Sequence, residues 1–170
     1  MKNSIYEEQV NFVSAKGTTG KIVAARLFGG VDILLAIEQL CEKHSIECGF
    51  ISVCIGSLRK VSFKYTARLV PTEKEGYVSN VEIQGPFQLL GGQGIITPSE
   101  ERGKREIHLH LIFSGNMVNV HGGHIKEGTL TLTTTDLVIT ETKGIRSVRE
   151  KDPETGIIFT RFEEETPDNQ

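Results

Sequence analysis

Apolar and polar residues alternate along much of the chain, and this pattern predicts a protein built mainly of β-strands. Residues 107–113 read Ile-His-Leu-His-Leu-Ile-Phe, and residues 60–65 read Lys-Val-Ser-Phe-Lys-Tyr. Successive side chains of a strand point to opposite faces, so this alternation is typical of a half-buried strand. Together with shorter apolar runs, it predicts strands at residues 21–28, 48–55, 58–69, 78–83, 86–96, 105–113, 117–121, 128–141, 143–150 and 156–163.

A single segment, residues 32–44, repeats with helical period. Asp32 follows Gly29-Gly30 and is a natural N-cap residue. Apolar residues then recur at the spacing of one helix face, as Ile33, Ile37, Leu40 and Cys41. One amphipathic helix among many antiparallel strands predicts an α+β fold, a mostly antiparallel sheet or partial barrel with the helix packed on it.

Length and composition predict one intracellular domain. The 170 residues fit a single domain over 1–170, with a core of about 21–162 and a flexible acidic tail at 163–170. A net charge of −3 argues against a large basic surface for nucleic acid. No apolar run approaches the ~18 residues of a membrane span. The acidic N-terminus and three cysteines without a Cys-x-x-Cys pair predict a cytoplasmic protein with buried free thiols.

Four of the five histidines lie between residues 108 and 124. His108 and His110 share one face of their predicted strand, because side chains two residues apart point the same way. A turn at 114–116 then reverses the chain. If it centres on Gly115-Asn116, simple parity pairs His110 with His121, whereas His124 reaches the same face only if Gly122-Gly123 forms a bulge. Parity leaves both alternatives open.

A third histidine beside His108 and His110 would complete a metal site. Neutral imidazoles suit zinc, copper, iron or nickel, and three histidines with an open fourth position are typical of catalytic zinc. We therefore expect a divalent metal, zinc before the others.

Several short motifs follow one another in the order found in the "plants and prokaryotes conserved" (PPC) domain, which the chain resembles from about residue 21 to 162. They are Arg26-Leu27, Gly30-Val31-Asp32, Gly56-Ser57-Leu58-Arg59, Gly85-Pro86-Phe87-Gln88-Leu89-Leu90, His108-Leu109-His110 and Gly122-Gly123-His124.

The resemblance implies a homotrimer with an α+β fold. Some prokaryotic members hold a metal through histidines that match His108, His110 and His124, so the resemblance selects His124 over His121. Prokaryotic relatives are often called DNA-binding proteins, and the plant proteins carry AT-hooks. This chain lacks the Arg-Gly-Arg-Pro core of an AT-hook, so we expect DNA binding to be weak.

The fold implied by the resemblance is shared with acetolactate decarboxylase, a zinc lyase with three histidine ligands. The plant-type motif has Arg and Glu where this chain has Pro86 and Gln88, so a carboxylate is missing there.

Two hypotheses follow from these motifs. In the first, a trimeric module binds a protein or DNA partner through a surface containing Gly85, Phe87, Gln88 and Leu90. In the second, a metal-dependent lyase or hydrolase acts on a small carboxylate-bearing molecule, with Arg59 holding the carboxylate.

Overall fold

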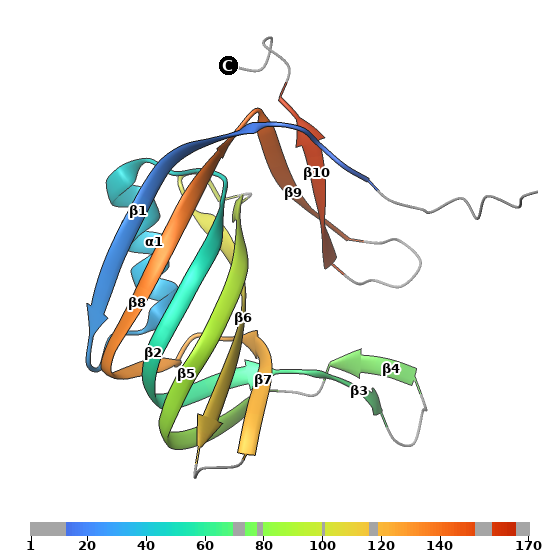
Figure 1. Cartoon of the computed structure of the whole chain (residues 1–170). Coiled ribbons are helices and arrows are strands. Elements are labelled where there is room, and N and C mark those ends of the chain that lie inside the picture. Colours follow the sequence, from blue (N-terminus) through green and yellow to red (C-terminus); the bar gives the residue numbers. More distant parts are fainter. Residues whose placement is uncertain are drawn as a thin grey trace, which may run out of the picture.

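One twisted antiparallel sheet forms the body of the protein (Figure 1). The computed structural model describes residues 13–69, 74–77, 80–99, 101–115, 119–151 and 158–165. Six strands follow the order β1-β8-β2-β5-β6-β7, and the end of β2 also pairs with β7, which closes β2, β5, β6 and β7 on themselves. This confirms the predicted α+β fold.

The elements, in chain order, are β1 (Thr18–Phe28), α1 (Ile33–His44), β2 (Gly49–Lys64), β3 (Thr66–Leu69), β4 (Lys74–Tyr77), β5 (Val81–Pro98), β6 (Arg105–Gly115), β7 (Asn119–Ile125), β8 (Leu130–Lys143), β9 (Ile145–Lys151) and β10 (Ile158–Glu164). Two small hairpins, β3–β4 and β9–β10, accompany the main sheet. The residues expected as an acidic tail begin inside β10, where Glu163 pairs with Arg146, and residues 166–170 lie outside the described residues.

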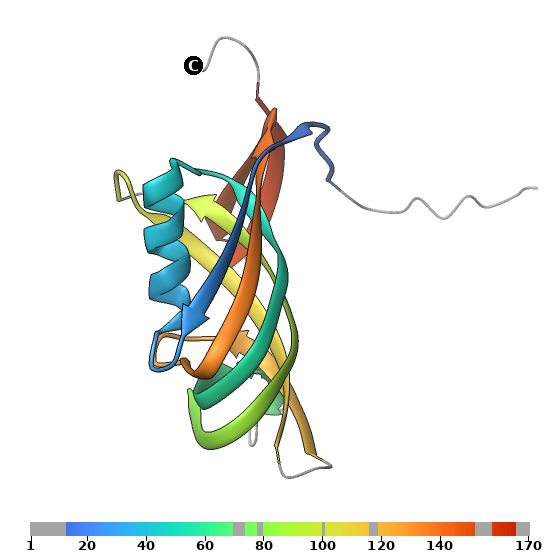
Figure 2. The same ribbon diagram turned by 60° about the vertical axis from the view of Figure 1, so that its left-hand side comes forward.

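Helix α1 lies against one face of the sheet (Figure 2). Asp32 is its N-cap, and its side chain accepts hydrogen bonds from the backbone of Leu34 (2.9 Å) and Leu35 (3.2 Å). Ser45, with a φ of 52°, ends the helix in a left-handed cap. The helix predicted from periodicity is therefore confirmed. It is twelve residues long, and no helix among the described residues is long and apolar enough to span a bilayer.

The hydrophobic core fills the space between α1 and the inner face of the sheet. Leu109, Leu111 and Phe113 supply the β6 side of this core and are at most 1% exposed. The helix contributes Ile33, Ala36, Ile37 and Cys41. The three cysteines are free and buried, as expected.

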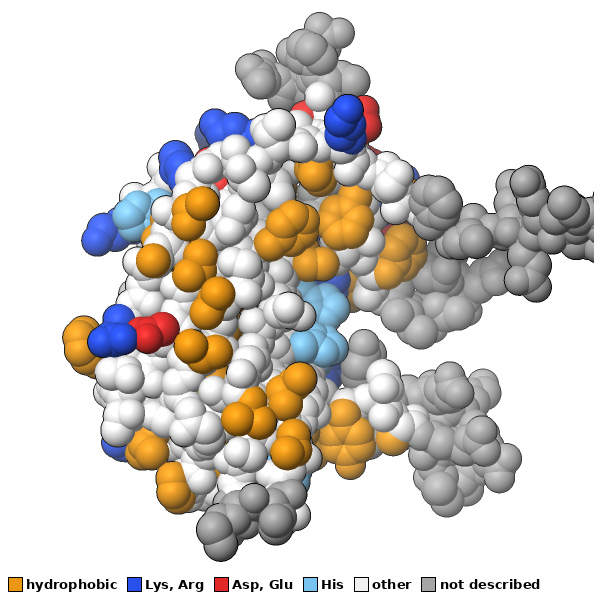
Figure 3. Space-filling model, viewed as in Figure 1, with side chains coloured by type: hydrophobic (Ala, Val, Ile, Leu, Met, Phe, Trp, Pro, Cys, Tyr) orange, Lys and Arg blue, Asp and Glu red, His pale blue; other side chains and the backbone are white. Residues whose placement is uncertain are grey.

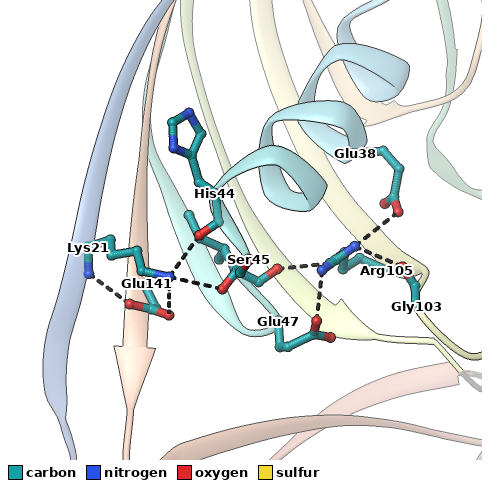
Figure 4. Close-up of polar contacts among 9 residues, drawn as sticks. Lys21, Glu38, His44, Ser45, Glu47, Gly103, Arg105 and Glu141 are labelled. Carbon is teal, nitrogen blue, oxygen red and sulfur yellow. Dashed lines mark hydrogen bonds and ion pairs between the residues drawn. The ribbon is translucent and has the colours of Figure 1, made fainter.

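Polar contacts fasten the C-terminal end of α1 to the sheet (Figure 4). Lys21 of β1 donates to the backbone oxygens of His44 (2.7 Å) and Ser45 (3.2 Å), which satisfies carbonyls that the end of a helix leaves over. Arg105 of β6, 4% exposed, pairs with Glu47 (2.7 Å) and donates to the backbone of Gly103 (2.8 Å). These contacts hold the start of β6, the strand that carries two of the histidines.

Two strands are longer than predicted. Residues 48–55 and 58–69 were expected as separate strands with a turn at Ser57, but β2 runs through this point. Gly56 adopts a φ of 150°, where a Cβ would lie 2.3 Å from the Thr134 oxygen, and the Ser57 hydroxyl hydrogen-bonds to Thr133 of β8 (2.7 Å). The chain thus bends inside the ladder instead of leaving it. Strand β5 likewise joins the segments expected at 78–83 and 86–96, from Val81 onward, and residues 78 and 79 of the first segment lie outside the described residues.

Candidate metal centre

His108, His110 and His124 come together on the face of the sheet turned away from α1. Among the described residues they form the one group of three or more side chains able to hold a metal, with candidate ligand atoms within 4.8 Å of one another. His110 pairs directly with His124 across β6 and β7, so both point to the same face. His108 lies two residues before His110 on the same strand, so its side chain points to this face as well.

The hairpin register explains why His124, and not His121, joins the pair. The last ladder pair is Gly115 with Asn119, and pairing continues without a shift to His110 and His124. The turn expected at 114–116 is placed too early, because Ser114 and Gly115 still pair with Val120 and Asn119. A turn centred on Gly115-Asn116 would pair His110 with His121, three residues before its actual partner. No bulge at Gly122-Gly123 is needed.

His121 lies on the opposite face of β7. It pairs with Phe113, and the two rings stack with centroids 5.8 Å apart. Because residues 121 and 124 differ by an odd number of positions, their side chains leave the strand on different sides. His121 therefore packs at the edge of the core and does not approach the other three rings.

The ring geometry fits a small cation. Nε2 of His108 lies 2.9 Å from Nε2 of His110. This separation is close to the distance of about 3.3 Å between two imidazole nitrogens on a tetrahedral zinc, given Zn–N bonds of 2.0–2.1 Å. Arg149 donates from Nη1 to Nδ1 of His108 (3.3 Å). The proton of neutral His108 is then on Nε2, between the two rings, and a bound cation would displace it.

Electrostatics keep the three imidazoles neutral. Burial lowers the pKa of His108 to about 4, with further contributions from His110, Arg149 and Lys64. Burial, then His108 and Lys64, lower the pKa of His124 to about 3. Burial lowers the pKa of His110 as well. At neutral pH all three rings keep the lone pairs that a metal requires.

Two cationic side chains flank the cluster. Lys64 of β2 pairs directly with His124, so its side chain leaves the same face. Arg149 of β9 reaches His108 from the other side, donates to Thr160 (2.9 Å) and forms an ion pair with Glu106 (3.5 Å). The β9–β10 hairpin thus contributes directly to the site.

Two hollows meet at His110 on this face. One, of about 390 Å³, is lined by Ser52, Val53, Cys54, Ile55, Gly91, Gly92, Gln93, His110 and Ile112. The other, of about 410 Å³, is lined by Lys64, Tyr65, Thr66, His110, Leu111, Ile112, Gly122, Gly123 and His124. Figure 3 shows histidine side chains in the middle of this face, among apolar side chains.

The other candidate residues lie elsewhere along β2 and β5. Arg59 is exposed on β2. Phe87 packs edge-on against Phe113 with centroids 5.3 Å apart, Gln88 donates to the backbone of Gly56 (2.9 Å), and Leu90 is 51% exposed. A Cβ at Gly85 would lie 2.6 Å from the Leu58 oxygen. None of these five residues lines either hollow, and their role as a pocket or partner surface stays a prediction.

Sequence reasoning did not find Lys64 and Arg149 as neighbours of the histidines. Lys64 becomes a neighbour because the end of β2 pairs with β7. Arg149 becomes one because β9 lies beside β5, where Ser147 donates to the Ile96 oxygen, and the Arg149 side chain reaches His108. Neither relation follows from local pattern. One feature of the sequence does point to Lys64: its position in the alternating segment 60–65 places its side chain on the polar face of the strand.

The comparisons identify the family. The model of the Plants and Prokaryotes Conserved domain matches residues 14–143, and the chain belongs to this family. A curated relative, the bifunctional protein GlmU from Synechococcus sp. (strain JA-2-3B'a(2-13)), is 28% identical over 138 residues, which are 81% of this chain. The chain spans about a fifth of the length of the curated relatives it matches.

Solved structures share the fold at under 25% identity. A hypothetical protein from Salmonella enterica has a TM-score of 0.74 and 22% identity, covering 89% of this chain and 98% of its own. The metal-containing protein AF0104 from Archaeoglobus fulgidus has a TM-score of 0.72 and 23% identity, covering 87% and 98%. A protein from Bacteroides thetaiotaomicron, called a "putative dna binding protein", has a TM-score of 0.68 and 18% identity, covering 89% and 99%.

Proposed function

We propose that this chain is a metal-binding module in which His108, His110 and His124 hold a divalent cation, zinc before the others. The observation that carries the proposal is the direct pairing of His110 with His124 beside His108, with the ligand atoms within 4.8 Å. Three neutral nitrogen donors fit zinc, which takes such sets with a fourth position left open. When bound, the metal would polarise an oxygen of whatever ligand occupies that position.

Metal analysis with a matched pair of variants tests the site. Protein produced without an affinity tag should contain about one zinc per chain, measured by elemental analysis. His124→Ala should lose it, whereas His121→Ala on the other face of the same strand should keep it. The reverse result, with His121 required and His124 dispensable, would contradict this ligand set.

We further propose that the module assembles as a homotrimer. The family supplies this expectation, and exposed apolar side chains that line neither hollow support it, since Ile22 is 69% and Val120 62% exposed. Burying such side chains against a second copy removes apolar surface from water. Light scattering should give about three times the chain mass of 18.8 kDa, and a monomer at micromolar concentration would contradict the proposal.

The second candidate function is a metal-dependent lyase or hydrolase acting on a small carboxylate-bearing molecule. The hollows beside His110 favour it, because a module that binds only a protein partner has no need of cavities next to its metal ligands. Turnover by the zinc-loaded protein that disappears in His110→Ala would establish that the metal site is catalytic and does more than bind a metal.

DNA is a weaker candidate partner. A structural relative bears a DNA-binding name, but the net charge of this chain is −3. We expect weak binding that falls steeply with added salt. Sequence-selective binding below micromolar concentration at about 150 mM salt, measured by fluorescence anisotropy, would contradict this.

A further inference from the structure

Glycines create the two hollows beside the histidine cluster. Ile112 stands next to His110 on the same face of β6, and its partners on both neighbouring strands are glycines, Gly91 of β5 and Gly122 of β7. A side chain at either position would cover the sheet beside Ile112. Because neither glycine carries a side chain, His110 and Ile112 form a ridge with a hollow on each side.

Gly91 leaves its hollow open without being required by the backbone. A Cβ built there meets nothing within 4 Å, and its φ is not in the left-handed region. Its neighbour Gly92 differs, because a Cβ there would lie 2.2 Å from Cδ2 of Leu111 in the core. Gly92 is therefore needed for packing, whereas Gly91 can be replaced as a test of what the hollow does.

The hollow over Gly91 is mainly apolar, and it ends at a polar row. Val53, Ile55 and Ile112, which are 36%, 47% and 54% exposed, supply its apolar side chains. Direct ladder partners place four polar side chains in a row that crosses the ridge, in the order Gln93, His110, His124 and Lys64. Gln93 lines the hollow over Gly91, whereas His124 and Lys64 line the other hollow.

Positive charge gathers around this row. Lys64 and Arg149 stand on two sides of the histidines, and Lys126 is close enough to lower the pKa of both Lys64 and His124. Glu106 balances part of the charge of Arg149. A divalent cation on the histidines would add two further positive charges, so the site would attract a negatively charged group.

From this arrangement we propose that the cluster binds a small carboxylate with an apolar body. The carboxylate lies at the three histidines beside Lys64, and the apolar body lies in the hollow over Gly91, against Val53, Ile55 and Ile112. The inference rests on the proposed metal site and names its ligand class. A ligand with both parts matches the charge on one side of the ridge and the apolar lining on the other.

Calorimetric titration of zinc-loaded protein with hexanoate tests the proposal. Hexanoate should bind at least about tenfold more tightly than acetate, since burying even part of four methylene groups is worth that factor at about 0.8 kcal/mol for each. Hexanol, which has the same chain without the charge, should bind no better than acetate. Equal binding of acetate and hexanoate, or tighter binding of inorganic phosphate, would overturn the proposal.

Two variants separate the two halves of the site. Gly91→Leu fills the hollow and should lower hexanoate affinity about tenfold while leaving acetate binding and zinc content unchanged. Lys64→Gln should weaken both carboxylates about tenfold, whereas Lys104→Gln, at an exposed ion pair with Glu101, should change neither. Unchanged hexanoate binding in Gly91→Leu would overturn the placement of the apolar body.

Zinc content distinguishes failure of this inference from failure of the proposed function. Wild-type protein that holds zinc but ignores hexanoate contradicts only the inference, whereas protein that holds no zinc contradicts both. If Gly91→Leu alters the mass measured by light scattering and not hexanoate binding, the hollow is filled by a second copy of the chain, and the small-ligand proposal is wrong.

Discussion

The two faces of strand β6 carry different tasks. On the inner face, Leu109, Leu111 and Phe113 are at most 1% exposed and belong to the hydrophobic core. On the outer face, His108 and His110 alternate in sequence with these residues; His108 is half-buried and His110 is exposed. Because side chains alternate, changes on one face need not disturb the other. Stability should therefore depend on the inner face and metal chemistry on the outer one, and this separation can be measured.

The largest effect on stability should come from truncating the inner face. Phe113→Ala removes a fully buried ring that contacts Phe63 and Phe87, and should lower the free energy of unfolding by about 3–5 kcal/mol. Ile112→Ala, one position along the same strand but 54% exposed, should cost less than about 1 kcal/mol. Urea denaturation of both variants checks this, and equal losses would contradict the separation of the faces.

A smaller effect should appear when the pH is raised, and it also concerns the inner side. Burial raises the pKa of Cys54 to about 12 and that of Cys41 to about 11. The folded protein keeps these thiols protonated, whereas the unfolded chain ionises them above about pH 9. Their contribution to the free energy of unfolding is therefore fully present below that pH and is lost as the pH rises.

The free energy of unfolding should therefore fall between pH 8 and pH 10, by about 1 kcal/mol for the ionisation of one such thiol in the unfolded chain. Urea denaturation at the two pH values measures this loss. It should be smaller in Cys54→Ala, whose side chain cannot ionise. An identical pH dependence in that variant would show that other groups cause the loss.

The sequence predicts the separation of the two faces but not the composition of the site. Alternation alone places Leu109 and His110 on opposite sides of β6, and capping by Asp32 locates the helix, because both depend on neighbouring residues. The partner of His110 depends on a hairpin register that parity cannot choose. Arg149 lies 41 residues beyond His108, and only the packing of a separate hairpin brings it there.

The smallest effect on stability should come from the outer face, although the change in chemistry there is complete. Replacing both His108 and His110 by alanine should abolish zinc binding, since one imidazole cannot hold the metal. Neither ring is part of the core, so the melting temperature of the metal-free double variant should match that of metal-free wild type within a few degrees.

Thermal melts in the presence and absence of a chelator separate the two contributions. Wild type should lose stability when zinc is removed, because a ligand that binds only the folded state stabilises it by mass action, whereas the double variant should not respond. Full zinc retention by the double variant would show that His108 and His110 do not hold the metal. A large loss of stability in its metal-free form would instead show that the outer face helps to hold the fold together, so that the two faces of β6 are not separable.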